Sequence, residues 1–245
     1  MRSVHPRTAI VAVLLAATTL SGCGGIRRDY EYEEELYLAL DGTATLAVSA
    51  SVPALVALRG ADLPVDPRAR IDRADVRRFF QGPAADVTAV SLSRRHGRRF
   101  VHATLTVRDV RRVAEHPAFA WSGYRFAAAG DVLEYRQAVG ASRQVALPGA
   151  GWTGAERVAF RFHLPSEIPF HTSPNPLQRG NILEWDQPLA ERLAGRPVDI
   201  RIQMEPNSIL YTTLRLFLGT ILAAVATFVV VIWWVVRRGR AAEPA

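Results

Sequence analysis

Alternating apolar and polar residues run through the central part of the chain and predict β-strands. The clearest pair covers residues 30–40 and 43–52, where apolar side chains recur at every second position. Asp41-Gly42 between them is a strong signal for a two-residue hairpin turn. The same alternation predicts about nine strands in all, the others over residues 87–93, 100–107, 121–128, 132–139, 157–164, 182–185 and 198–204.

Helical periodicity interrupts these strands in short stretches, over residues 53–58, 66–81, 109–115 and 189–193. Pro53 suits the first turn of the first helix, and Gly82-Pro83 stops the second. Tight turns join consecutive strands, which favours a mostly antiparallel sheet. The pattern thus predicts an α+β domain over residues 30–209, with about nine strands and three or four short helices.

An uncharged apolar run over residues 216–236 follows this domain and is long enough to cross a bilayer as one helix. Arg237, Arg238 and Arg240 come directly after it, whereas Arg215 alone precedes it. Positive charge collects on the cytoplasmic side of such spans, so the C-terminus is expected in the cytoplasm. We therefore assign residues 210–236 to a transmembrane helix and residues 237–245 to a cytoplasmic tail.

The first 22 residues have the pattern of a bacterial export signal, with a basic start and an apolar run too short for a stable span. Leu20-Ser21-Gly22-Cys23 then resembles the lipobox of bacterial lipoproteins. That resemblance implies cleavage before Cys23 and its acylation, with residues 23–29 as the lipidated N-terminus and linker. The alternative is an ordinary export signal with an inert cysteine.

Together the two ends predict an extracytoplasmic domain held at the cytoplasmic membrane by a lipid and by one spanning helix. Two such anchors amount to permanent attachment. The formal net charge of +7 would otherwise suggest nucleic acid as a partner, but a domain outside the cytoplasm rarely meets it.

Composition excludes several chemistries. All 30 basic residues are arginine, so no lysine can bind phosphate in a P-loop or form a Schiff base. The single cysteine rules out an internal disulfide and a cysteine-based zinc site. GxSxG and HExxH motifs are absent from the sequence, and the glycine-rich run GAGWTG at residues 149–154 is interpreted as a loop. We expect no catalytic residues and no cofactor.

The histidines give no clear metal pattern. His163 and His171 lie near Glu167, Glu184 and Asp186 in sequence, but the spacing of the two histidines matches no common ligand pattern. A polar group beside a proline-rich loop is the simpler interpretation.

His96 and His102, on the arms of the 94–99 turn, are interpreted as surface residues. That turn carries four arginines, Arg94, Arg95, Arg98 and Arg99. One interpretation is docking onto anionic lipid headgroups. The other is a solvated hairpin tip that prevents edge aggregation. The acidic run at residues 29–35 lies near the lipid anchor, and is expected to face away from an anionic surface or to pair with these arginines.

Several short motifs resemble the LppM-like group of bacterial envelope lipoproteins; they involve Cys23, Asp41, Gly42, Pro165, Asn175, Gly180, Asn181 and Trp185. The resemblance covers the two ends and little of the middle of the chain. It implies an α+β envelope domain that binds a lipid or another apolar ligand, without known catalytic residues. Asn181 and Trp185 also fit a turn and a buried tryptophan.

Two functions remain open. The first is a non-catalytic accessory or structural subunit of an envelope complex, which should expose an apolar patch to a protein partner. The second is a domain that binds an envelope lipid or apolar ligand, which needs a cavity lined by residues such as Phe126, Val158, Phe160 and Phe162.

Overall fold

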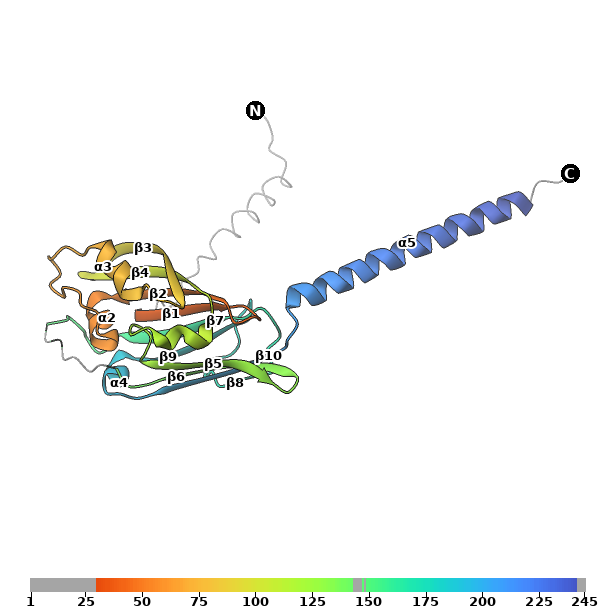
Figure 1. The fold of residues 1–245 in the computed structure, drawn as a ribbon. Coiled ribbons are helices and arrows are strands. Elements are labelled where there is room, and N and C mark those ends of the chain that lie inside the picture. The colour runs from red at the N-terminus through yellow and green to blue at the C-terminus, as the bar shows by residue number, and fades with distance from the viewer. Residues whose placement is uncertain (1–29, 143–146, 148, 242–245) are drawn as a thin grey trace, which may run out of the picture.

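The computed structural model describes residues 30–142, 147 and 149–241, in which ten strands form two sheets (Figure 1). The six-stranded sheet has the order β3 (Ala85–Arg95), β4 (Arg98–Val107), β2 (Ala44–Ser51), β1 (Tyr30–Leu38), β7 (Arg157–His163) and β9 (Ile182–Pro188). The four-stranded sheet has the order β5 (Ser122–Ala129), β6 (Val132–Val139), β10 (Val198–Met204) and β8 (Phe170–His171). We call them the large and the small sheet.

Neighbouring strands pair antiparallel except β1 and β7, which run parallel. The predicted α+β class and mostly antiparallel pairing are confirmed. The chain divides its strands between two sheets instead of one, because alternation along a strand does not show which sheet the strand joins. β8 is a two-residue strand within the proline-rich segment, too short to leave a periodic signal.

The hydrophobic core lies between the two sheets and draws on alternate positions of their strands. Tyr32 and Leu36 of β1 and Leu46 of β2 point inward from the large sheet, and all are at most 4 % exposed. Tyr135 and Ile202 close the core from the small sheet and are fully buried. The alternation of apolar residues predicted the inward positions of Tyr32, Leu36 and Leu46 correctly.

Short helices connect strands of the two sheets. α2 (Val52–Arg59) follows β2 directly; the Ser51 hydroxyl accepts from the amide of Ala54, and Gly60 ends the helix at a φ of +69°. α3 is Arg73–Phe80, followed by the 3-10 helix η1 (Val110–Glu115) and α4 (Leu189–Leu193).

The predicted start of the second helix at residue 66 is wrong. Asp72 caps α3 instead, its carboxylate accepting from the amide of Ala74. Asp66 accepts from the amide of Arg68 two residues on, and this local turn competes with a helix.

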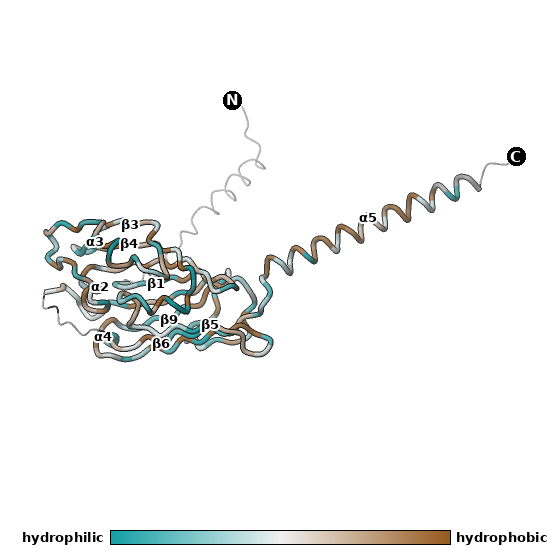
Figure 2. Tube along the Cα trace, in the orientation of Figure 1, coloured by the Kyte–Doolittle hydropathy of each residue, from teal (hydrophilic) through white to brown (hydrophobic). Residues whose placement is uncertain are grey.

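A long helix, α5 (Ile209–Ala241), projects away from the sandwich (Figure 1). Within Ile209–Val235, the most apolar 18-residue window has a mean hydropathy of 2.5 and is 0 % buried within the structure (Figure 2). By length and composition α5 is able to cross a membrane. The hydroxyls of Thr220 and Thr227 donate to carbonyls four residues earlier, which suits an apolar environment.

Candidate functional site

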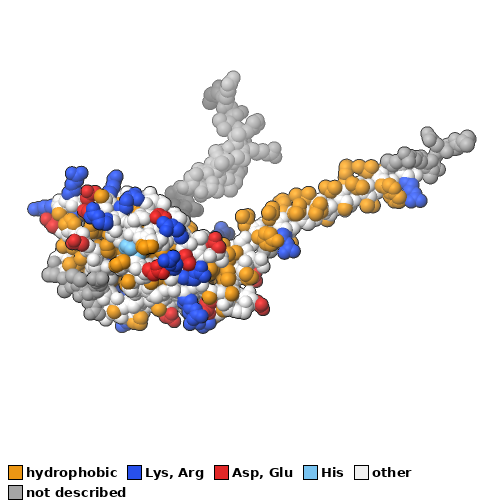
Figure 3. All heavy atoms as spheres, viewed as in Figure 1, with side chains coloured by type: hydrophobic (Ala, Val, Ile, Leu, Met, Phe, Trp, Pro, Cys, Tyr) orange, Lys and Arg blue, Asp and Glu red, His pale blue; other side chains and the backbone are white. Residues whose placement is uncertain are grey.

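The turn between β3 and β4 places the predicted basic cluster at one end of the large sheet. Arg95 and Arg98 are opposite each other in the register, and Arg95 donates to the carbonyl oxygen of Tyr30, the first residue of β1. α2 lies at this same end, opposite to α5 (Figure 1). Arginine side chains project from this end of the domain (Figure 3).

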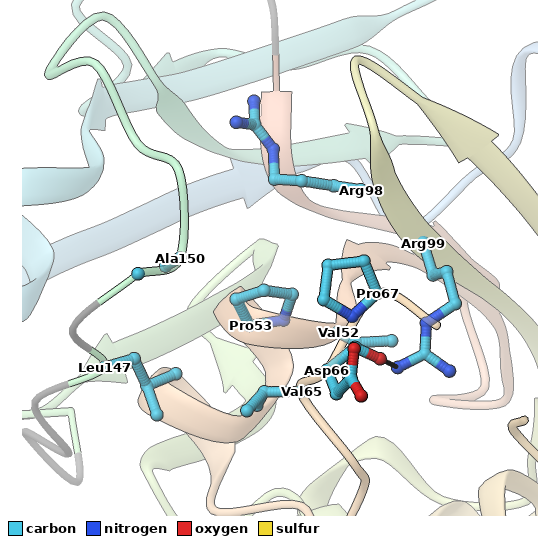
Figure 4. Close-up of a pocket in the computed structure, with 10 residues that line it drawn as sticks. Val52, Pro53, Val65, Asp66, Pro67, Arg98, Arg99, Leu147 and Ala150 are labelled. Atoms are coloured by element: carbon cyan, nitrogen blue, oxygen red, sulfur yellow. Dashed lines mark hydrogen bonds between the residues drawn. The ribbon is translucent and has the colours of Figure 1, made fainter. Parts of the chain in front are cut away.

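Arg99 is a structural residue of this end. Its side chain is buried and donates to the carbonyl oxygens of Pro64, Asp66 and Ala69, with 2.7 Å to that of Asp66 (Figure 4). Burial, and then the charge of Arg94, lowers the pKa of the guanidinium. Arg99 therefore holds the irregular segment before α3 and is not presented to solvent.

Arg98 is also engaged within the domain. Its guanidinium lies 2.8 Å from the carboxylate of Glu31 and 3.7 Å from that of Glu156, and it donates to the Gly151 carbonyl at 2.6 Å. Glu31 is fully buried, and the Arg98 side chain is 14 % exposed. The pair thus fixes the turn to the start of β1.

Arg94 and Arg95 are the more accessible members of the predicted cluster. Arg94 is exposed and donates to the Pro67 carbonyl at 3.2 Å, while Arg95 stacks over Phe100 at 4.3 Å. Exposed Arg68 and Arg70 lie on the neighbouring loop. We call these four residues, Arg68, Arg70, Arg94 and Arg95, the basic end. Docking of this end onto a headgroup stays a prediction.

Three hollows surround the turn. The first has a volume of about 240 Å³ and combines apolar walls from Val52, Pro53 and Val65 with Arg98 and Arg99 (Figure 4). The second, of about 560 Å³, includes Arg68, Arg70 and Arg94. The third, of about 410 Å³, lies on the outer face of the large sheet. Arginines beside open hollows suit an anionic group.

The third hollow contains a contact that the sequence did not reveal. The Nδ1 of His102 lies 2.9 Å from the Ser49 hydroxyl, and its Nε2 lies 2.8 Å from that of Ser93. Burial, then the charge of Arg95, lowers the pKa of His102, which favours the neutral imidazole. The three residues come from three adjacent strands, so their meeting depends on sheet register.

The acidic residues of β1 divide between the two faces of the sheet. Glu33 and Glu35 pair with Arg161 on the outer face, and Glu31 pairs with Arg98. Glu34 points inward, is 4 % exposed, and lies 3.3 Å from fully buried Arg59. Pairing of Glu31 with the turn agrees with the expectation, whereas Glu34 in the core does not. Tyr32, whose hydroxyl donates to Glu34 at 2.7 Å, has a pKa raised by burial.

The residues considered for metal binding do not converge. His163 stacks on Tyr37 at 4.0 Å, while Glu184 and Asp186 pair with Arg161 and Arg157. Within residues 30–142, 147 and 149–241, no group of three or more histidine, cysteine or acidic side chains is placed to hold a metal ion.

The motif residues near the C-terminal strands have structural contacts. Asn181 adopts a φ of +55° and donates to the Ser166 carbonyl at 2.7 Å, and Asn175 donates to the Glu184 carbonyl at 3.2 Å. Trp185 is buried with its ring edge-on to Phe162 at 5.4 Å. These contacts hold the proline-rich segment on β9. Cys23, the predicted lipidation site, lies outside the described residues.

Comparison with known proteins adds little. No family model matches the chain, and no curated protein matches it. Among solved structures, the NMR structure of the folded domain of LppM from Mycobacterium tuberculosis is similar at 10 % identity and a TM-score of 0.39. The match covers 73 % of this chain and 91 % of that domain. At this level the similarity carries no argument about function.

Proposed function

We propose that this chain is an LppM-like envelope lipoprotein whose extracytoplasmic domain is a non-catalytic accessory subunit of a membrane complex. The observation that carries the proposal is α5, joined directly to a packed two-sheet domain. Its apolar side chains contact lipid or other helices, because the sandwich leaves them exposed. A lipid on Cys23 supplies the second anchor.

Side chains at the end where α5 begins support a protein partner. Tyr37, Phe170 and Leu177 are each 43–44 % exposed. Tyr37 is the second-last residue of β1, and Phe170 pairs with Gln203 near the end of β10, so both lie close to the base of α5. Apolar side chains gather where the domain meets this helix (Figure 3). Such exposure is typical of surfaces that bind other proteins.

The orientation is testable with reporters fused after Ala245 in the full chain. We expect a reporter that needs the cytoplasm to be active there, and one that needs export to be inactive, because arginines follow the span. Fusion after Ser208, before α5, should reverse both results. Export activity after Ala245 would contradict the orientation.

Cys23→Ala should abolish incorporation of a labelled fatty acid, and persistent labelling would contradict the lipid anchor.

The partner is testable by placing a photo-crosslinking residue at Phe170 in living cells, with Arg125 on β5 as the control position. We expect a discrete protein adduct at position 170. Leu177→Ser should weaken this adduct about tenfold or more, since burying a leucine contributes about 1.5–3 kcal/mol. Adducts at position 170 that contain lipid and no protein would instead favour the lipid-binding alternative.

That alternative has less support inside the sandwich. Phe126, Val158, Phe160 and Phe162 were expected to line a cavity, but each is at most 6 % exposed and packs in the core between the sheets. The three hollows around the turn are lined by other residues. A lipid would therefore bind at the surface, or after the sheets separate.

A further inference from the structure

The two anchors leave the sandwich at opposite ends of the large sheet. Tyr30 begins β1 beside the basic end, where Arg95 contacts its carbonyl. The start of α5 is held at the other end, because the amide of Ile209 donates to the carbonyl of Pro165, shortly after β7 ends. Since β1 and β7 run parallel, nearly the whole length of β1 separates the anchors. This length is about 26 Å at ~3.3 Å per residue.

The linker from Cys23 is too short for an upright domain. Residues 23–29 span at most about 25 Å, even when fully extended. With the strands along the membrane normal, Tyr30 would lie about 26 Å above the start of α5. The start of α5 would lie about 10 Å above Leu216, where the uncharged run begins. The height of about 36 Å exceeds the reach by about 11 Å. A lipid on Cys23 and a spanning α5 therefore require the domain to tilt.

The base of α5 permits such a tilt. Residues 205–208 separate β10 from the helix. At this junction the amides of Glu205 and Ile209 donate to the carbonyls of Glu167 and Pro165, and Ser166 forms a β-bridge with Ser208. The apolar window of α5 buries nothing against the sandwich, so side-chain packing does not fix the angle between them.

We infer that the domain lies on its side against the outer surface of its own membrane, with the basic end on anionic phospholipid headgroups. The inference rests on the proposed double anchor. Tilting brings the end of the domain that contains Tyr30 towards the membrane, and Arg95 donates a hydrogen bond to the carbonyl of Tyr30. Arg68, Arg70 and Arg94 are exposed beside it. The nearby carboxylates of Glu31 and Glu156 already pair with Arg98, which leaves the basic end to attract phosphate groups.

The orientation is measurable with the full acylated chain in bilayer nanodiscs. A fluorophore is attached to His96→Cys at the basic turn, or to Ala129→Cys at the end next to α5. Energy transfer to a dye on the lipid headgroups reports the height of each position. Acylation blocks the thiol of Cys23, so each variant carries a single label. In the chain of natural length we expect position 96 to lie as close to the headgroups as position 129.

A longer linker separates the effect of the tether from the effect of charge. With about 20 flexible residues inserted after Gly25, the tether no longer forces contact. We then expect position 96 to stay near anionic phosphatidylglycerol bilayers and to leave zwitterionic phosphatidylcholine bilayers. R68E/R94E in this background should reduce the docked-to-released ratio on anionic bilayers about 30-fold or more. The matched control R125E/R179E should leave it unchanged.

The outcomes distinguish the inference from the proposed function. If the Cys23 peptide carries its acyl mass but position 96 lies far from the headgroups, only the inferred orientation of the domain is overturned. Equal release from both bilayers with the long linker would overturn the role of the basic end. A Cys23 peptide without acyl mass would overturn the double anchor, and with it both the proposed function and this inference.

Discussion

Replacing Arg59 by methionine should lower the free energy of unfolding by about 3–5 kcal/mol, because it leaves a buried carboxylate without its cation. Arg59 is fully buried, donates to the Ala118 carbonyl at 2.5 Å, and lies 3.3 Å from Glu34. Its guanidinium also stacks at 4.8 Å over Phe119 and Trp121. Denaturant unfolding of the chain in detergent measures the change.

Two comparisons separate this charge effect from lost packing. Glu34→Gln in the Arg59→Met background should recover part of the loss, because a neutral amide no longer needs the cation. Arg78→Met breaks an exposed ion pair with Asp75, and should cost less than about 0.5 kcal/mol. Equal costs for Arg59→Met and Arg78→Met would show that the buried pair does not stabilise the fold.

Phe162→Ala should cost about 3–5 kcal/mol, because it opens a cavity where the two sheets meet. Phe162 of β7 is 2 % exposed, and its ring lies 5.3 Å from that of Tyr135 across the core and 5.4 Å from that of Trp185 on β9. The ring of Phe162 thus contacts side chains of both sheets. The same unfolding measurement applies.

Phe170→Ala is the matched control for Phe162→Ala. Phe170 is 43 % exposed on the two-residue strand β8, so its truncation should change stability by less than about 0.5 kcal/mol. A loss at Phe162 as small as that at Phe170 would contradict the role of Phe162 in joining the sheets.

Local patterns predicted much of the fold. The ranges expected for β6, β10 and α4 agree with the structure to the residue, because each segment has clear periodicity and turn residues on both sides. The division into two sheets and the parallel pairing of β1 with β7 could not be predicted. Both depend on contacts between distant segments, which periodicity along one strand does not contain.

The candidate site was predicted in position but not in detail. The basic turn is visible as a run of arginines, yet the partners of Arg98 and Arg99 are Glu31 and the carbonyls before α3, far away in sequence. The sequence therefore could not show which arginines remain accessible. The inward position of Glu34 was hidden for the same reason, since its partner Arg59 lies on another element.

The parallel pairing of β1 with β7 also affects the order in which the chain folds. Contacts within this pair join residues as far apart as Glu33 and Arg161, which are 128 positions apart. Because the N-terminal part of the chain becomes available first, β1 to β4 can pair antiparallel early. One edge of β1 stays unpaired until β7 becomes available. Such non-local pairing makes folding slow and leaves that edge open to aggregation meanwhile. Glu33 and Glu35, which lie on the outer face of β1, place like charges beside this edge until β7 pairs with it.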